Sequence, residues 1–130
     1  MPISYSIDHQ RNLVRTAATG ILTDEDVLRH KRALMADPQF KAGMRELSDV
    51  RAIEDLRVTP AGVRSMVAVD GVSADKLAAY RLAIVASGDT TFGMARMCQL
   101  MTAANVRHVG VFRSLAEAAG WLGIDSLDAE

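Results

Sequence analysis

The feature that most constrains the fold is an unbroken apolar run, Leu82–Ala86, within the segment Arg81–Ser87. A strand made of such residues has no polar side to turn toward water, so both of its faces must be covered. Strands of this kind are typical of the interior of a parallel sheet with helices packed on it. The run therefore predicts a central strand over Arg81–Ser87 in an α/β sheet.

Shorter patterns predict the other strands. The segment Ile3–Asp8 alternates apolar and polar side chains, as a half-buried strand does. The polar connection His9–Asn12 is short enough for a hairpin into a second strand, Leu13–Thr19, which Gly20 is expected to end. The remaining strands are predicted over Met44–Arg51 and Val109–Phe112.

Helix starts are marked by capping residues. Thr23 precedes three carboxylates, which favour the positive end of a helix, so a helix is predicted over Asp24–Ala36, before Pro38. Thr59 and Pro60 open a second helix, with Thr59 as its cap and a stop expected at Asp70-Gly71. Further helices are predicted over Ser73–Tyr80, Thr90–Asn105 and Leu115–Leu122, the last with a capping box between Ser114 and Glu117.

The resulting order is ββαβαβαβα. Strands that alternate with helices need crossover connections, which favour a largely parallel sheet. We therefore expect a single α/β domain over residues 1–124, with a mixed sheet of about five strands flanked by helices, and a C-terminal tail over 125–130. A chain of 130 residues suits one domain.

Composition excludes several classes of function. The net charge is −1, from 15 basic and 16 acidic side chains, without the basic excess of a nucleic-acid binder. Cys98 is the only cysteine, so neither an internal disulfide nor a multi-cysteine metal site is expected. Neither a signal peptide nor a membrane span is predicted, and the expectation is a cytoplasmic protein.

No catalytic or metal-binding motif is found. His9, His30 and His108 are scattered, and none lies three or four residues from another histidine or cysteine. His30, four residues after Asp26, is expected on a helix surface. No cofactor, no metal and no enzymatic activity are therefore expected.

The best candidate for a ligand site lies where buried strands end. Ser87, Gly88 and Asp89 link a buried strand to a helix, and Arg51 and Arg113 follow two other strands. Ligands of open α/β sheets bind at this edge, so the five residues could hold a carboxylate or a phosphate. The simpler alternative is that Asp89 or Thr90 caps the helix and that each arginine is solvated or paired with an aspartate.

The helix over Thr90–Asn105 is rich in methionine. Phe92, Met94, Met97 and Met101 make it apolar over more than one stripe, as at an adaptable interaction surface. The default alternative is that these side chains belong to the core. Cys98, within the same patch, is expected to be packed and unreactive.

Several of these segments together resemble the STAS-like group of bacterial proteins, which are similar to the anti-sigma-factor antagonist SpoIIAA. The resemblance covers about Ile3 to Gly123. It rests on the opening hairpin and on the segments Leu22–Asp26, Leu47–Arg51, Leu82–Ala86, Phe92–Met97, Val111–Arg113 and Leu115–Leu122. The stretch Phe-Gly-x-Ala-Arg-Met is the most specific of them.

The resemblance implies a mixed sheet with helices that acts as a non-catalytic regulatory or ligand-sensing module. Antagonists carry an Asp-Ser-Ser-Gly-like turn whose serine is phosphorylated. Here the equivalent stretch, Asp55–Pro60, has no serine, and Thr59 is its only hydroxyl. The resemblance therefore supports the fold more firmly than the phospho-switch.

Two functions follow as expectations. The first is a protein-interaction module that binds a partner or a second copy of itself as a homodimer, through Phe92, Met94, Met97 and Met101. The alternative is a module that binds a small apolar, lipid or anionic ligand near Arg51, Ser87 and Arg113.

Overall fold

The computed structural model describes residues 2–72, 80–101 and 108–124. Five strands and four helices follow one another there in the predicted order. Their bounds are β1 Ile3–Asp8, β2 Leu13–Thr23, α1 Asp24–Ala36, β3 Arg45–Arg57, α2 Pro60–Val72, β4 Arg81–Val85, α4 Asp89–Met101, β5 His108–Phe112 and α5 Leu115–Leu122.

The five strands form one mixed sheet in the order β1-β2-β3-β4-β5. The hairpin strands β1 and β2 are antiparallel, and the pairs β2/β3, β3/β4 and β4/β5 are parallel. This confirms the predicted α/β architecture. The apolar run is the interior strand β4, but the middle of the sheet is β3, because the hairpin adds two strands on one side of β3 and the crossovers add two on the other.

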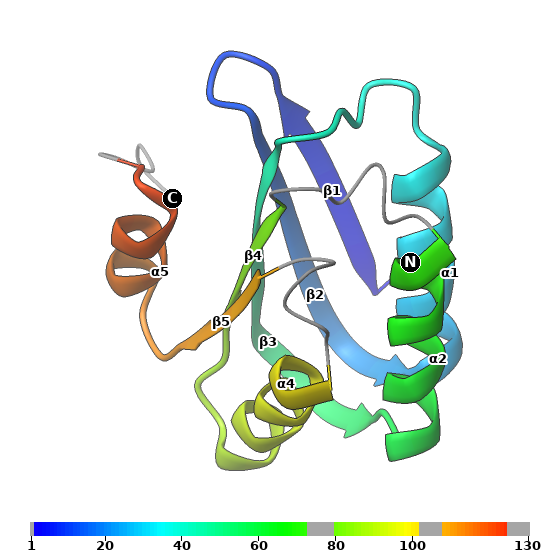
Figure 1. The fold of residues 1–130 in the computed structure, drawn as a ribbon. Coiled ribbons are helices and arrows are strands. Elements are labelled where there is room, and N and C mark those ends of the chain that lie inside the picture. The colour runs from blue at the N-terminus through cyan, green and yellow to red at the C-terminus, as the bar shows by residue number, and fades with distance from the viewer. Residues whose placement is uncertain (1, 73–79, 102–107, 125–130) are drawn as a thin grey trace.

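Helices cover both faces of the sheet (Figure 1). α1, α2 and α4 lie on one face, where α2 packs against both of its neighbours. α5 lies on the opposite face, against β3, β4 and β5. Alternate residues of β4 point to opposite faces of the sheet. Leu82 packs in the core beneath α1, whereas Ala83 and Val85 pack beneath α5.

The strands β2 and β3 are longer than predicted. β2 does not end at Gly20 but continues to Thr23, because Gly20 adopts a left-handed φ of 69° at an irregularity in the pairing with β3. β3 continues past Arg51 to Arg57. The pairing of β3 with β4 ends at Asp49 and Val85, so the far halves of β2 and β3 extend beyond the rest of the sheet as a two-stranded ribbon.

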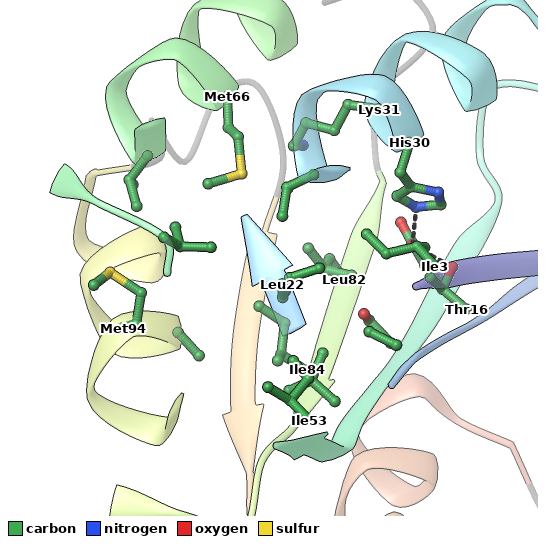
Figure 2. A pocket seen from close by; sticks show the side chains of 18 of the residues that line it. Ile3, Thr16, Leu22, His30, Lys31, Ile53, Met66, Leu82, Ile84 and Met94 are labelled. Atoms are coloured by element: carbon green, nitrogen blue, oxygen red, sulfur yellow. Dashed lines mark hydrogen bonds and ion pairs between the residues drawn. The ribbon is translucent and has the colours of Figure 1, made fainter. Parts of the chain in front are cut away.

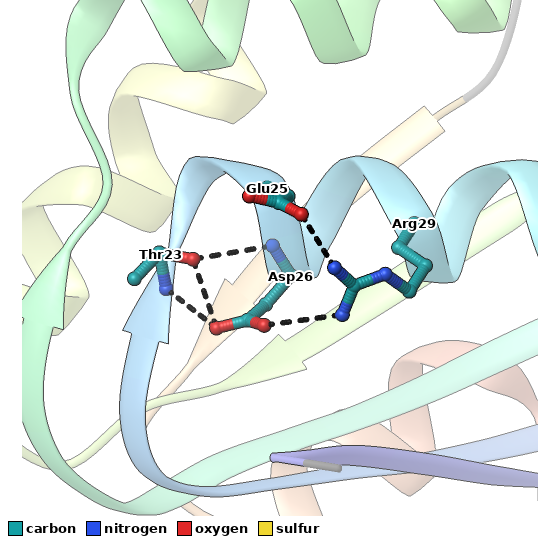
Figure 3. A network of polar contacts seen from close by, with 4 residues as sticks. All are labelled: Thr23, Glu25, Asp26 and Arg29. Carbon is teal, nitrogen blue, oxygen red and sulfur yellow. Dashed lines mark hydrogen bonds and ion pairs between the residues drawn. The ribbon is translucent and has the colours of Figure 1, made fainter.

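The predicted caps hold the helix ends. Thr23 Oγ1 accepts from the Asp26 amide and the Asp26 carboxylate accepts from the Thr23 amide, which is a complete capping box (Figure 3). Arg29 lies against Asp26 and Glu25 and extends this network along the first turn. At α5, Ser114 Oγ accepts from the Glu117 amide, but the Glu117 carboxylate accepts from the Ser114 hydroxyl, so only half of the predicted box forms.

The cap of α2 is shared with α1. Thr59 Oγ1 accepts from the Gly62 amide at 3.1 Å, as predicted, and donates to the Asp24 carboxylate at 2.6 Å. Pro60 is the first helical residue.

The expected stop at Asp70-Gly71 is wrong, since α2 runs to Val72. The helix predicted over Ser73–Tyr80 falls outside the described residues up to 79, as do the end of the helix predicted to reach Asn105 and the tail 125–130.

Candidate functional site

A cavity of about 130 Å³ lies between the sheet and the layer formed by α1, α2 and α4. Figure 2 shows its wall, where aliphatic and methionine side chains surround the space. His30 and Thr16 lie at one end of this wall, and Met66 and Met94 lie at the other. The cavity is therefore an apolar chamber with one polar end.

The two-residue period of the strands builds the floor of this cavity. Leu82 and Ile84 of β4 point into it, and the intervening Ala83 packs on the other face of the sheet. The long ribbon contributes Leu22 and Ile53, which lie beyond the reach of β4. The helices supply the roof.

Glu46 occupies the polar end. Its side chain is buried among three donors that come from three separate parts of the chain. Thr16 Oγ1 donates to Oε2 at 2.7 Å, the Tyr80 hydroxyl donates to Oε1, and His30 Nε2 lies 3.5 Å from Oε2. Both carboxylate oxygens therefore have partners, as a charge in a protein core requires.

These contacts set the ionisation of Glu46. Burial on its own raises the pKa of this carboxyl, because it removes water from the charged form. The hydrogen bond and positive charge of His30, with the hydrogen bonds of Tyr80 and Thr16, outweigh burial and lower the pKa to about 2. Glu46 is thus ionised at neutral pH and accepts from all three neighbours.

His30 is not the surface histidine that the sequence predicted. Its side chain is only 11% exposed and faces Glu46, whereas Asp26 pairs with Arg29 instead. The ring of Tyr5 meets the His30 ring edge-on at 5.5 Å. The Tyr5 hydroxyl in turn donates to Asp37 at 2.7 Å, and this bond, with burial and the charge of Asp37, raises the pKa of Tyr5 to about 12. Tyr5 therefore fixes the orientation of the imidazole.

The candidate anion site at the strand ends is occupied by internal pairs. Arg51 binds Asp49 with two bonds of 2.9 Å, which hold the pKa of the Asp49 carboxyl below its usual value. Arg113 donates to the Ser87 carbonyl at 3.0 Å, contacts Asp89 at 3.2 Å and lies over the Phe92 ring. Gly88 is exposed beside Asp89. The structure thus brings Arg113 to Ser87 and Asp89, while Arg51 is paired within its own strand.

Two methionines of α4, Met94 and Met97, face inward. Met94 and Met97 are partly buried and pack on the core cluster of Ala18, Leu22 and Val63. Phe92 is half-buried beneath Arg113, and the Leu100 side chain is exposed, at 77%. α4 includes Cys98 and Met101, whose side chains fall outside the described ones.

Within the described ranges, no three His, Cys, Asp or Glu side chains gather in a way that could hold a metal ion. No helix in the same ranges is both long and apolar enough to cross a bilayer.

Comparison with known proteins places the fold. No family model matches the chain, and no curated protein matches it in sequence. Among solved structures, the chain is similar to an uncharacterised protein of the DUF3478 family with a SpoIIAA-like fold from Shewanella loihica PV-4, with a TM-score of 0.61 and 19% sequence identity. The likeness covers 92% of this chain and 93% of that one. The chain therefore has a SpoIIAA-like fold, which is the fold that the sequence resemblance implied.

Proposed function

We propose that this protein is a non-catalytic binding module that takes up a small, largely apolar molecule in the cavity beneath α1, α2 and α4. The observation that carries the proposal is the cavity itself, about 130 Å³ of space lined almost wholly by apolar side chains. An engineered apolar cavity of roughly 150 Å³ stays dry and binds benzene, so a space of this size suits a ligand of about six carbon atoms.

The polar groups of the cavity support binding rather than catalysis. A general base needs a free lone pair within reach of its substrate. Glu46 already accepts from Thr16, Tyr80 and His30, and these contacts lower its pKa to about 2, so this carboxylate is a weak base.

The ligand site proposed here differs from the one that the sequence suggested. The residues Arg51, Ser87, Gly88, Asp89 and Arg113 are exposed, and none of them lines the cavity. An apolar ligand is also what the sequence predicts, but at the strand ends and not in this cavity.

Self-association through the methionine helix receives less support from the geometry. Met94 and Met97 pack against the core, and among the described side chains of α4 the exposed large apolar one is Leu100, which makes no patch alone. A homodimer stays a prediction, which light scattering of the full chain would check.

The test of the proposed function is the thermal stability of the full chain in increasing benzene. Because a ligand that binds the folded state stabilises it by mass action, Tm should rise with benzene concentration. Ala95→Leu adds three carbon atoms at the buried α4 wall of the cavity and should abolish this rise. Ala68→Leu, the same change at an exposed position of α2, should retain it. An absence of any rise in the wild-type chain would overturn the proposal.

A further inference from the structure

Three donors at the polar end of the cavity are committed to one acceptor. Thr16 has a single hydroxyl hydrogen, which points to Glu46 Oε2, and the hydroxyl hydrogen of Tyr80 points to Oε1. His30 presents Nε2 to the same carboxylate. What Thr16 has left are oxygen lone pairs, so its remaining capacity is to accept hydrogen bonds.

The negative charge of Glu46 also disfavours an anionic ligand at this end of the cavity. A ligand carboxylate placed beside Glu46 would put two negative charges together in a site with little water, where their repulsion is strong. Lys31, the lysine of the lining, is already engaged in an interaction of its own. An ammonium group would lose its hydration, and three of the roughly four acceptor sites of the Glu46 carboxylate are already filled.

From this geometry we infer that the ligand is an uncharged amphiphile with an apolar body and one hydrogen-bond donor, such as a phenol or a short alcohol, and that the donor binds the oxygen of Thr16. The inference rests on the proposed function, since it names the chemistry of the head group that the same cavity accepts.

A series of ligands of similar size tests the inference on the wild-type chain. Benzene and fluorobenzene fill the space without donating a hydrogen bond, phenol adds one uncharged donor, and benzoate adds a negative charge. A typical hydrogen bond contributes about 1 kcal/mol net, so phenol should bind roughly three- to tenfold more tightly than fluorobenzene. Benzoate should show no binding at the same concentrations. Dissociation constants come from calorimetric titration at neutral pH.

One variant tests the donor's partner. Thr16→Val keeps the shape of the side chain and removes its hydroxyl. It should reduce the preference for phenol over fluorobenzene to about one, with the affinity for fluorobenzene unchanged. Thr91→Val makes the same chemical change on the α4 part of the lining and should leave the preference intact.

The outcomes separate the two proposals. Fluorobenzene binding as tightly as phenol, or benzoate binding as tightly as either, would overturn the inference and leave an apolar binding module. Binding of none of the aromatic compounds would overturn the proposed function and the inference with it. The ligand series on the wild-type chain decides between these results even if a variant fails to fold.

Discussion

At the scale of single residues, Glu46 makes the free energy of unfolding depend on pH in the acid range. Its folded pKa of about 2 lies below the ordinary 4.5, so its ionised form is favoured by folding. This contribution is complete above pH 4.5 and is lost as the pH falls toward 2. A shift of this size corresponds to about 3 kcal/mol.

The first prediction concerns Glu46→Gln. The free energy of unfolding of the wild-type chain should fall steeply between pH 4.5 and about 2, and the variant should lack that part of the slope because it has no proton to take up. Urea titrations at a series of pH values measure both. Glu54→Gln, at an exposed position, should follow the wild-type curve. Parallel curves for wild type and Glu46→Gln would contradict the role given to Glu46.

A second residue-scale prediction concerns Gly62. A Cβ at this position would stand 1.9 Å from Asp24 Oδ1, whose carboxylate caps α2 through the Thr59 amide at 2.8 Å. Gly62→Ala should therefore displace Asp24 and cost about 1–3 kcal/mol in unfolding free energy, of the order of a lost cap with added strain.

The double variant separates this clash from a general effect on the helix. In an Asp24→Ala background the obstructing carboxylate is gone, so Gly62→Ala should cost nothing or stabilise, since alanine favours helix more than glycine does. Chemical denaturation of the four proteins of this cycle gives the coupling energy. An equal cost in both backgrounds would show that Asp24 is not what requires glycine here.

The sequence could not reveal the site around Glu46, although it placed the residue in a strand. The partners of Glu46 are far along the chain, with Thr16 30 residues before it and Tyr80 34 residues after it. No local spacing links such residues, and only the packing of β2, β3 and α1 brings them together. The pairing of Arg51 with Asp49, two residues away in one strand, was within reach of local reasoning.

At the scale of elements, two arginines attach α5 to the sheet. Arg45 donates to the Leu122 carbonyl at 2.8 Å, and Arg81 donates to the Trp121 carbonyl while its guanidinium lies 4.3 Å from the Trp121 ring centre. Cations at the end of a helix complement its dipole and satisfy its free carbonyls. β3 and β4, which carry these arginines at their first residues, thus hold the C-terminal end of the helix.

We therefore predict that Arg81→Met loosens α5. The loss of the hydrogen bond and of the cation–π contact should cost about 1–3 kcal/mol. Trp121 is the only tryptophan, so a red shift of its fluorescence would report the exposure of its ring. Arg96→Met, on the exposed side of α4, should leave both stability and emission unchanged. An unshifted spectrum with wild-type stability in Arg81→Met would refute this attachment.

Helix starts were easier to predict than strand ends. Thr23, Thr59 and Ser114 each cap the helix assigned to them, because a capping side chain reaches an amide within its own turn. Gly20 was misread as the end of a strand, since a glycine marks a bulge as readily as a stop. Whether a strand continues depends on its neighbour, and β3 supplies that partner for the second half of β2.

At the scale of the whole molecule, the helices on the two faces of the sheet pack differently against it. On one face α5 packs closely, with Ala118 and Leu122 against Leu13 and Leu47. On the other face α2 rests on α1 and α4, and the cavity separates this layer from part of the sheet. The cavity described above therefore lies on the side of α1, α2 and α4, opposite the cluster beneath α5.

This asymmetry leads to a prediction about pressure. Unfolding under pressure is favoured by the loss of internal voids, and the volume change scales with the void that disappears. Ala95→Leu, which fills part of the 130 Å³ cavity, should lower the magnitude of the unfolding volume and raise the free energy of unfolding by about 1 kcal/mol. Pressure titration followed by Trp121 fluorescence measures both quantities. Ala68→Leu on the exposed side of α2 should change neither quantity. If Ala95→Leu left the unfolding volume unaltered, water would already fill the cavity of the unliganded protein, which would contradict the dry cavity expected from its apolar lining.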